Sequence, residues 1–133
     1  MNEETPRHIV VLEDEPPVRL LVEEILTSAG YSVRAAGRGM DVLKEVRRHT
    51  PDLVISDLTV PGLDGYQVIT MLRRSGDFNG PILVLSGRTS EEDVHTALEY
   101  GAQAFLKKPV KREELLETVA GLLNPESGSE ENS

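Results

Sequence analysis

The chain has 133 residues, which is enough for one domain with a single core and too few for two ordinary domains. It contains 14 Lys and Arg residues against 23 Asp and Glu residues, and the net charge of -9 argues against binding of nucleic acid by this chain. It has no cysteine, which excludes a disulfide framework, a thiolate nucleophile and a cysteine-based zinc site.

The two ends of the chain differ in character from its centre. The first residues, MNEETPRH, are polar and lack the apolar core of a signal peptide, and no apolar run approaches the roughly 20 residues that span a bilayer. We therefore expect a soluble cytoplasmic protein that does not act at a membrane. We expect a disordered N-terminus over residues 1–7, one domain over 8–124, and a flexible acidic tail or linker start over 125–133.

Five short apolar runs predict five strands. They are HIVVL (8–12), YSVRAA (31–36), DLVIS (52–56), PILVLS (81–86) and AFLK (104–107). Three of them are continuously apolar instead of alternating, which is typical of strands covered on both faces of a parallel sheet.

The segments between these runs have helical periodicity. The apolar positions of the five predicted helices are Val18, Leu21, Val22, Ile25, Leu26 and Ala29; Leu43 and Val46; Val68, Ile69, Met71 and Leu72; Val94, Ala97 and Leu98; and Leu115, Leu116, Val119, Leu122 and Leu123. Gly30 and Gly76 are predicted to end the first and third helices, and Ser90 to cap the fourth. Strand–helix alternation predicts an α/β fold with a doubly wound, flavodoxin-like parallel sheet of five strands in the order 2-1-3-4-5.

In such a sheet, ligands bind at the carboxyl ends of the strands, where the strand order reverses. The first strand is followed there by Glu13 and Asp14, and the third by Asp57. Carboxylates packed this closely repel each other, and a hard divalent cation such as Mg²⁺ would remove the conflict. The fourth strand brings Ser86 to the same edge and the fifth brings Lys108, which together form an arrangement suited to binding phosphate.

Each of these features also has a simpler interpretation when it is taken singly. The acidic residues after the first strand could form a solvated first turn of a helix, and Asp57 could be a helix cap. Ser86 could be a turn residue, and lysines are usually solvated surface residues. Lys107 is predicted to point to the other side of its strand from Lys108. The loop residues Pro61, Gly62, Asp64 and Gly65 are interpreted as turn chemistry.

Four motifs in order and spacing make the site interpretation specific: VVLEDEPPVR, DLVISDLTVPGLDG, ILVLSG and GAQAFLKKP. With them, the chain from about His8 to Asn124 resembles the CheY-like receiver domain of bacterial two-component response regulators. The resemblance implies that Asp57 accepts a phosphoryl group from a histidine kinase or a histidine phosphotransfer protein. It also implies that the domain catalyses only its own phosphorylation and dephosphorylation and is not otherwise an enzyme.

The same resemblance implies roles for the other site residues. Mg²⁺ would be held by Glu13, Asp14, Asp57 and the main-chain carbonyl of Thr59. Ser86 and Lys108 would bind phosphoryl oxygens, and the bond from Lys108 to Pro109 is expected to be cis. Thr59 and Arg88 stand at positions that tune the lifetime of the phosphoryl group. Glu13 replaces the more common Asp and Ser86 the more common Thr, and both are familiar variants.

The implied output is conformational. Movement of Ser86 toward the phosphoryl group would free space for the side chain of Phe105, where the family more often has Tyr. This coupled pair would alter the surface of the fourth helix, fifth strand and fifth helix, which an effector protein, an effector domain or a second copy of the chain would bind. Phe105 could also be a plain packing residue. His8, His49 and His95 are interpreted as scattered residues without a metal or phosphotransfer role.

Three other functions compete with this interpretation. A haloacid-dehalogenase-type phosphatase would need a second Asp where Thr59 stands, together with a cap or a larger core. A nucleotide- or flavin-binding module would need a Gly-rich turn after the first strand, where this chain has EDEPP. A degenerate receiver acting as a scaffold would not need Glu13, Asp14, Asp57, Ser86 and Lys108 intact.

The sequence is compatible with two arrangements of the whole protein. The chain could be a stand-alone receiver or the N-terminal receiver of a longer regulator. A methionine shortly before the first strand makes a receiver attached to the C-terminus of a kinase the less expected arrangement.

Overall fold

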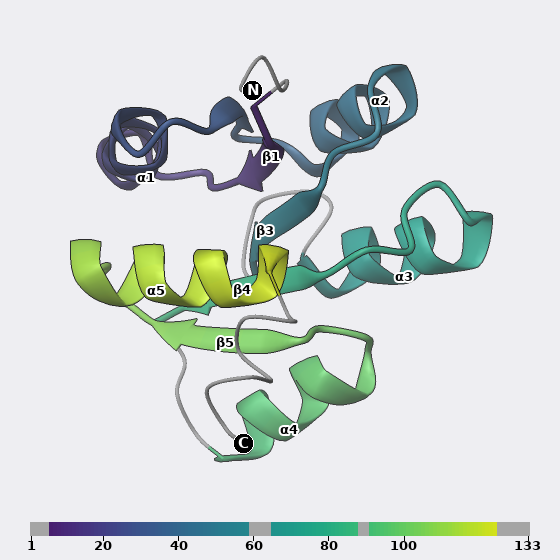
Figure 1. The fold of residues 1–133 in the computed structure, drawn as a ribbon. Helices are drawn as coiled ribbons and strands as arrows, with labels where there is room; N and C mark the ends of the chain where they lie inside the picture. Colours follow the sequence, from purple (N-terminus) through teal and green to yellow (C-terminus); the bar gives the residue numbers. More distant parts are fainter. Residues whose placement is uncertain (1–5, 59–64, 88–90, 125–133) are drawn as a thin grey trace.

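The computed structural model describes residues 6–58, 65–87 and 91–124, along which strands and helices alternate (Figure 1). The strands are β1 (His8–Leu12), β2 (Ser32–Ala36), β3 (Leu53–Asp57), β4 (Ile82–Ser86) and β5 (Ala104–Lys107). The helices are α1 (Pro16–Ser28), α2 (Gly39–Arg48), α3 (Gly65–Ser75), α4 (Glu91–Glu99) and α5 (Arg112–Leu123). Every predicted apolar run therefore forms a strand, with boundaries that differ by one residue at most.

The sheet has the strand order β2-β1-β3-β4-β5, and every pairing in it is parallel. This confirms the predicted order and the doubly wound fold. The inner strands β1, β3 and β4 are buried along all five residues, in keeping with their apolar sequences. The edge strands β2 and β5 are less buried.

The two faces of the sheet form two hydrophobic clusters, and β1 contributes to both. Ile9 and Val11 pack with residues of α1 and α5 on one face. Val10 and Leu12 pack with residues of α2, α3 and α4 on the other. Because successive strand residues point to opposite faces, only a continuous apolar run can fill both clusters. Full burial of each such side chain stabilises the fold by about 1.5–3 kcal/mol.

The predicted apolar faces of the helices were too wide in three places. Leu21, Met71 and Leu98 are 43%, 43% and 47% exposed, although each was predicted to face the core. Each stands next to a buried residue in the sequence, and successive helix residues differ in direction by about 100°. The neighbouring residue occupies the core-facing position in each case, which leaves these three side chains in solvent. Ala29 is likewise exposed, just beyond the end of α1.

Two predicted helix ends are confirmed by their backbone conformation. Gly30 follows α1 with φ of 100°, and Gly76 follows α3 with φ of 77°. Glycine adopts this left-handed region without the steric cost that other residues bear there. Within the described ranges, none of the helices combines the length and the apolar character that crossing a membrane requires.

Candidate functional site

Acidic side chains gather at the carboxyl edge of the sheet because β1 and β3 end there side by side. Leu12 of β1 pairs with Ser56 of β3, so the next residues, Glu13 and Asp57, emerge as neighbours. The backbone N–H of Glu13 donates a hydrogen bond of 2.9 Å to the carbonyl of Ala36, which fixes its position beside β2. The order of the strands thus brings together carboxylates that lie far apart in the sequence.

Three carboxylates form the acidic part of this site. Glu13, Asp14 and Asp57 each offer an oxygen atom, and these atoms all lie within 4.8 Å of one another. Glu13 is fully buried and Asp57 is only 3% exposed, whereas Asp14 is half-buried. Carboxylates at this separation and burial repel one another unless a cation lies among them.

Lys108 supplies one such cation from the end of β5. Its ammonium nitrogen lies 2.8 Å from Glu13 Oε1 and donates a hydrogen bond of 2.9 Å to Asp57 Oδ2. Glu15 Oε1 is farther away, at 3.8 Å. Lys107, by contrast, is exposed. The peptide bond between Lys108 and Pro109 is cis, which confirms that expectation.

The burial of this cluster changes the proton affinities of two groups. Burial raises the pKa of Glu13 above its ordinary value, and the nearby charge of Asp57 adds to the effect, although Lys108 and the N–H of Glu15 oppose it. Burial alone would lower the pKa of Lys108, but its contacts with Glu13 and Asp57 outweigh that effect and raise it. Lys108 is therefore a fixed positive charge at neutral pH.

The donor set fits a hard divalent cation. Beyond its ion pair with Lys108, the buried Glu13 Oε1 has no hydrogen-bond partner among the described residues. A carboxylate oxygen left with spare capacity beside two further carboxylates is suited to Mg²⁺, which prefers oxygen ligands and retains several waters. The residues present therefore fit the metal that the sequence predicts.

Ser86 and Phe105 lie on adjacent strands close to this edge. Ser86 is fully buried at the end of β4, and its carbonyl accepts a hydrogen bond of 2.9 Å from the N–H of Lys108. Phe105 lies opposite Val84 in the β4–β5 register and packs, half-buried, against the core on the α2–α3–α4 face. This hydrogen bond links the end of β4 to Lys108, which directly follows the strand that carries Phe105.

Several residues singled out in the sequence lie outside the described residues. Thr59 and Arg88 are the two with predicted roles at the site, and Ser90 is the predicted helix cap. The turn residues Pro61, Gly62 and Asp64 lie outside as well.

Gly65 has a second role that its interpretation as a turn residue missed. It is buried at the start of α3, and its N–H donates a hydrogen bond of 3.0 Å to the carbonyl of Leu58. A Cβ atom at this position would collide with the carbonyl oxygen of Asp57 and lie 2.7 Å from Leu58 Cα. Glycine is a poor helix former, so a glycine at the first position of a predicted helix can indicate that another backbone segment lies against it. Here that segment is Asp57 and Leu58.

A model of the family described as "Response regulator receiver domain" matches residues 9–120, a span that includes Glu13, Asp57, Ser86 and Lys108. The chain belongs to the response regulator receiver domain family. A curated relative is the transcriptional regulatory protein AfsQ1 of Streptomyces coelicolor, 37% identical over 103 residues, which cover 77% of this chain and 45% of AfsQ1. The chain spans about half the length of the curated relatives it matches.

Solved structures agree with this assignment. The chemotaxis protein CheY4 of Vibrio cholerae is 29% identical, with a TM-score of 0.85 over 90% of this chain and 100% of CheY4. The receiver domain of the sensor histidine kinase PA1611 from Pseudomonas aeruginosa is 27% identical, with a TM-score of 0.82 over 90% of this chain and 99% of that domain. The latter structure is described with a magnesium ion coordinated in its active site cleft.

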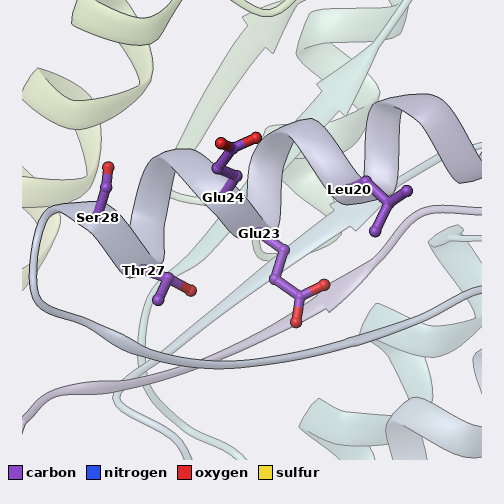
Figure 2. A pocket seen from close by; sticks show the side chains of 5 residues that line it. All are labelled: Leu20, Glu23, Glu24, Thr27 and Ser28. Carbon is purple, nitrogen blue, oxygen red and sulfur yellow. The ribbon is translucent and has the colours of Figure 1, made fainter.

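A pocket of this receiver domain lies away from the acidic cluster, on α1. It is lined by Leu20, Glu23, Glu24, Thr27 and Ser28 (Figure 2). Figure 2 shows Glu23 and Thr27 pointing to the same side of the helix. None of the site residues predicted from the sequence lines this pocket.

The interpretation of the histidines as scattered is wrong for two of the three. The rings of His8 and His49 stack, with centroids 4.3 Å apart and an angle of 9° between their planes. His49 follows α2 and His8 begins β1, and both lie near the amino edge of the sheet because the chain returns there to begin β3. His95 is separate, on α4, with its Nε2 3.1 Å from Glu99 Oε2.

Replacement of Glu13 with Gln should raise the free energy of unfolding of the metal-free receiver domain at pH 7. The pKa of Glu13 is raised in the folded protein, so its ionisation costs stability as pH rises from the ordinary value of 4.5 through the raised one. Urea unfolding in EDTA should therefore show a higher midpoint for Glu13→Gln at pH 7 and a smaller difference from wild type at pH 4. Glu15→Gln, at an exposed position, is the matched control, and an equal or lower midpoint for Glu13→Gln would contradict the argument.

Proposed function

We propose that this receiver domain is the switch of a two-component system and that Asp57 is its phosphoacceptor. The observation that carries the proposal is the contact of a single lysine with two buried carboxylates: Lys108 Nζ lies 2.8 Å from Glu13 Oε1 and 2.9 Å from Asp57 Oδ2. A cation held against a buried carboxylate at a strand end is placed to neutralise charge that arrives on that carboxylate.

Phosphorylation would begin with attack of an Asp57 carboxylate oxygen on the phosphorus of a phosphohistidine. An O–P bond forms as the P–N bond breaks, and the imidazole leaves with its electron pair. Lys108 would move its hydrogen bond from Asp57 to a phosphoryl oxygen, and the Ser86 hydroxyl would donate to another. Phosphoryl transfer mostly requires positioning and charge neutralisation, which these side chains supply.

We assign Mg²⁺ as the cofactor, held by Glu13, Asp14, Asp57 and the main-chain carbonyl of Thr59. When bound, it would neutralise the charge shared by the carboxylates and the incoming phosphoryl group. Hydrolysis resets the switch: water adds to the phosphorus of the acyl phosphate, the O–P bond to Asp57 breaks, and inorganic phosphate leaves. Thr59 and Arg88 are proposed to set the rate of this step.

The proposed output is a change in the α4–β5–α5 surface. Ser86 would follow the phosphoryl group, and the half-buried Phe105 on the neighbouring strand would take a new rotamer. The partners would be a histidine kinase or phosphotransfer protein on the input side, and an effector or a second copy on the output side. We place this activity in the cytoplasm, within a domain that spans residues 8–124.

Wild-type protein incubated with acetyl phosphate and Mg²⁺ should gain one phosphoryl group, detected by intact-mass measurement. The gain should disappear when EDTA replaces Mg²⁺, because the three clustered carboxylates then repel the phosphoryl oxygens. Incorporation that survives alkali or hydroxylamine would contradict an acyl phosphate. Failure to incorporate phosphate from both acetyl phosphate and a panel of phosphorylated histidine kinases would overturn the proposed function.

A further inference from the structure

A second cluster of metal-ligating side chains lies at the opposite edge of the sheet from Asp57. His8 begins β1, Glu45 lies on α2, and His49 follows the last residue of that helix. Each offers one ligand atom, and these atoms all lie within 4.8 Å of one another. The cluster joins β1 to the end of α2, and the proposed phosphorylation mechanism makes no use of it.

The buried imidazole of His8 offers one ring nitrogen, Nε2, as a metal ligand in this cluster. His8 is only 7% exposed, and its Nε2 has no hydrogen-bond partner among the described residues. Glu45 Oε2 lies 3.7 Å from this nitrogen, too far for a hydrogen bond. The other ring nitrogen, Nδ1, lies 3.3 Å from Ser32 Oγ. With the Nδ1 hydrogen donated to that hydroxyl, Nε2 presents its lone pair, which is how metal-binding histidines are usually oriented.

The charges around the cluster decide which class of cation it suits. Glu45 already forms an ion pair with Arg48, at 2.9 Å, and lies 3.8 Å from Arg34 Nε. A carboxylate whose charge is partly compensated is a weak ligand for a hard cation such as Mg²⁺, which relies on negative oxygen atoms. Neutral imidazoles suit a borderline cation such as Zn²⁺. Burial lowers the pKa of His8, with the neighbouring His49 adding to the effect and Glu45 opposing it.

We propose that His8 Nε2, one ring nitrogen of His49 and Glu45 Oε2 bind a single zinc-class divalent cation, with water in the fourth position. A tetrahedral zinc site needs ligand atoms about 3.3 Å apart, so the three groups must draw closer together. The lone pairs of the stacked rings lie in parallel planes, so one ring must turn to share a metal. His49 is exposed and can turn without loss of core packing. The bound metal would tie the end of α2 to β1.

The test is a Zn²⁺ titration of the untagged full chain at pH 7.5, followed by calorimetry. An excess of Mg²⁺ is included to compete at the Glu13–Asp14–Asp57 cluster. Wild type should bind one Zn²⁺, and His49→Gln should weaken binding at least about tenfold. His95→Gln is the matched control, because His95 is also exposed and also lies beside a glutamate, and it should bind as wild type does.

A spectroscopic readout identifies the ligands independently of affinity. In NMR spectra of the ring nitrogens, Zn²⁺ should shift the resonances of His8 and His49 and leave those of His95 unchanged. Co²⁺ in place of Zn²⁺ should give the visible absorption of a tetrahedral site in wild type and lose it in His49→Gln. Undiminished Zn²⁺ binding by His49→Gln, or equal shifts at His95, would overturn the proposal. Asp57→Asn should bind Zn²⁺ as wild type does, which separates this site from the proposed phosphorylation site.

Discussion

Asp57→Asn should take up no phosphoryl group from acetyl phosphate and Mg²⁺ under conditions in which wild type is modified. The amide keeps the size and shape of the carboxylate but offers no anionic oxygen to attack phosphorus. The expected loss is complete because Asp57 is the proposed phosphoacceptor, and the other two carboxylates of the cluster, Glu13 and Asp14, are proposed to hold Mg²⁺. Intact mass after incubation measures the difference directly.

The matched control for this variant is Asp41→Asn. Asp41 is exposed in the first turn of α2, away from the acidic cluster, so its replacement should leave phosphorylation at the wild-type level. Circular dichroism should show both variants folded. Phosphorylation of the Asp57→Asn protein would show that another residue is the acceptor, and peptide mapping would then locate that residue.

Lys108→Met should lower the free energy of unfolding at pH 7 by about 2–3 kcal/mol in the absence of Mg²⁺. Removal of one partner from a fully buried ion pair costs about 3–5 kcal/mol, and we reduce that figure because the Lys108 side chain is 16% exposed. Methionine retains most of the packing of the lysine side chain, so the loss of stability reflects the missing positive charge. The raised pKa of Lys108 implies that the stabilisation is present at neutral pH and is lost as pH rises through that value.

Magnesium separates this electrostatic loss from a packing defect. Addition of Mg²⁺ should recover part of the lost stability in Lys108→Met, because a divalent cation can take over the neutralisation of the carboxylates. Lys107→Met is the control, since Lys107 is exposed one residue earlier, and its unfolding free energy should change by less than about 0.5 kcal/mol. A deficit in Lys108→Met that Mg²⁺ leaves unchanged would point to packing instead.

The fold could be predicted from sequence because its signals are local and agree with one another. Ile9, Val10 and Val11 must form a strand covered on both faces, since no helix face or half-exposed strand would bury all three. Right-handed crossovers, in a chain with too few strands for a barrel, favour the doubly wound order, and that order brings Glu13 to Asp57. The acidic half of the site was therefore predictable before any contact between side chains was known.

The remaining features depend on contacts that the sequence does not encode locally. Lys108 was predicted to bind phosphate, but its simultaneous contact with Glu13 and Asp57 depends on the reach of its side chain from the end of β5, past β4, to the ends of β3 and β1. The stacking of His8 on His49 depends on where α2 ends relative to β1. Residues of separate elements meet here without any motif that spans them, so their spacing carried no signal.

The shortness of β1 bears on how its two ends communicate. At a rise of about 3.3 Å per residue, the five steps from His8 to Glu13 cover about 16 Å. Groups farther apart than about 10 Å that share no partner usually contribute additively to stability. His8 contacts Ser32, His49 and Glu45, whereas Glu13 contacts Glu15 and Lys108. Cations bound at the two ends would therefore act as independent ligands, each raising the melting temperature without altering the affinity of the other.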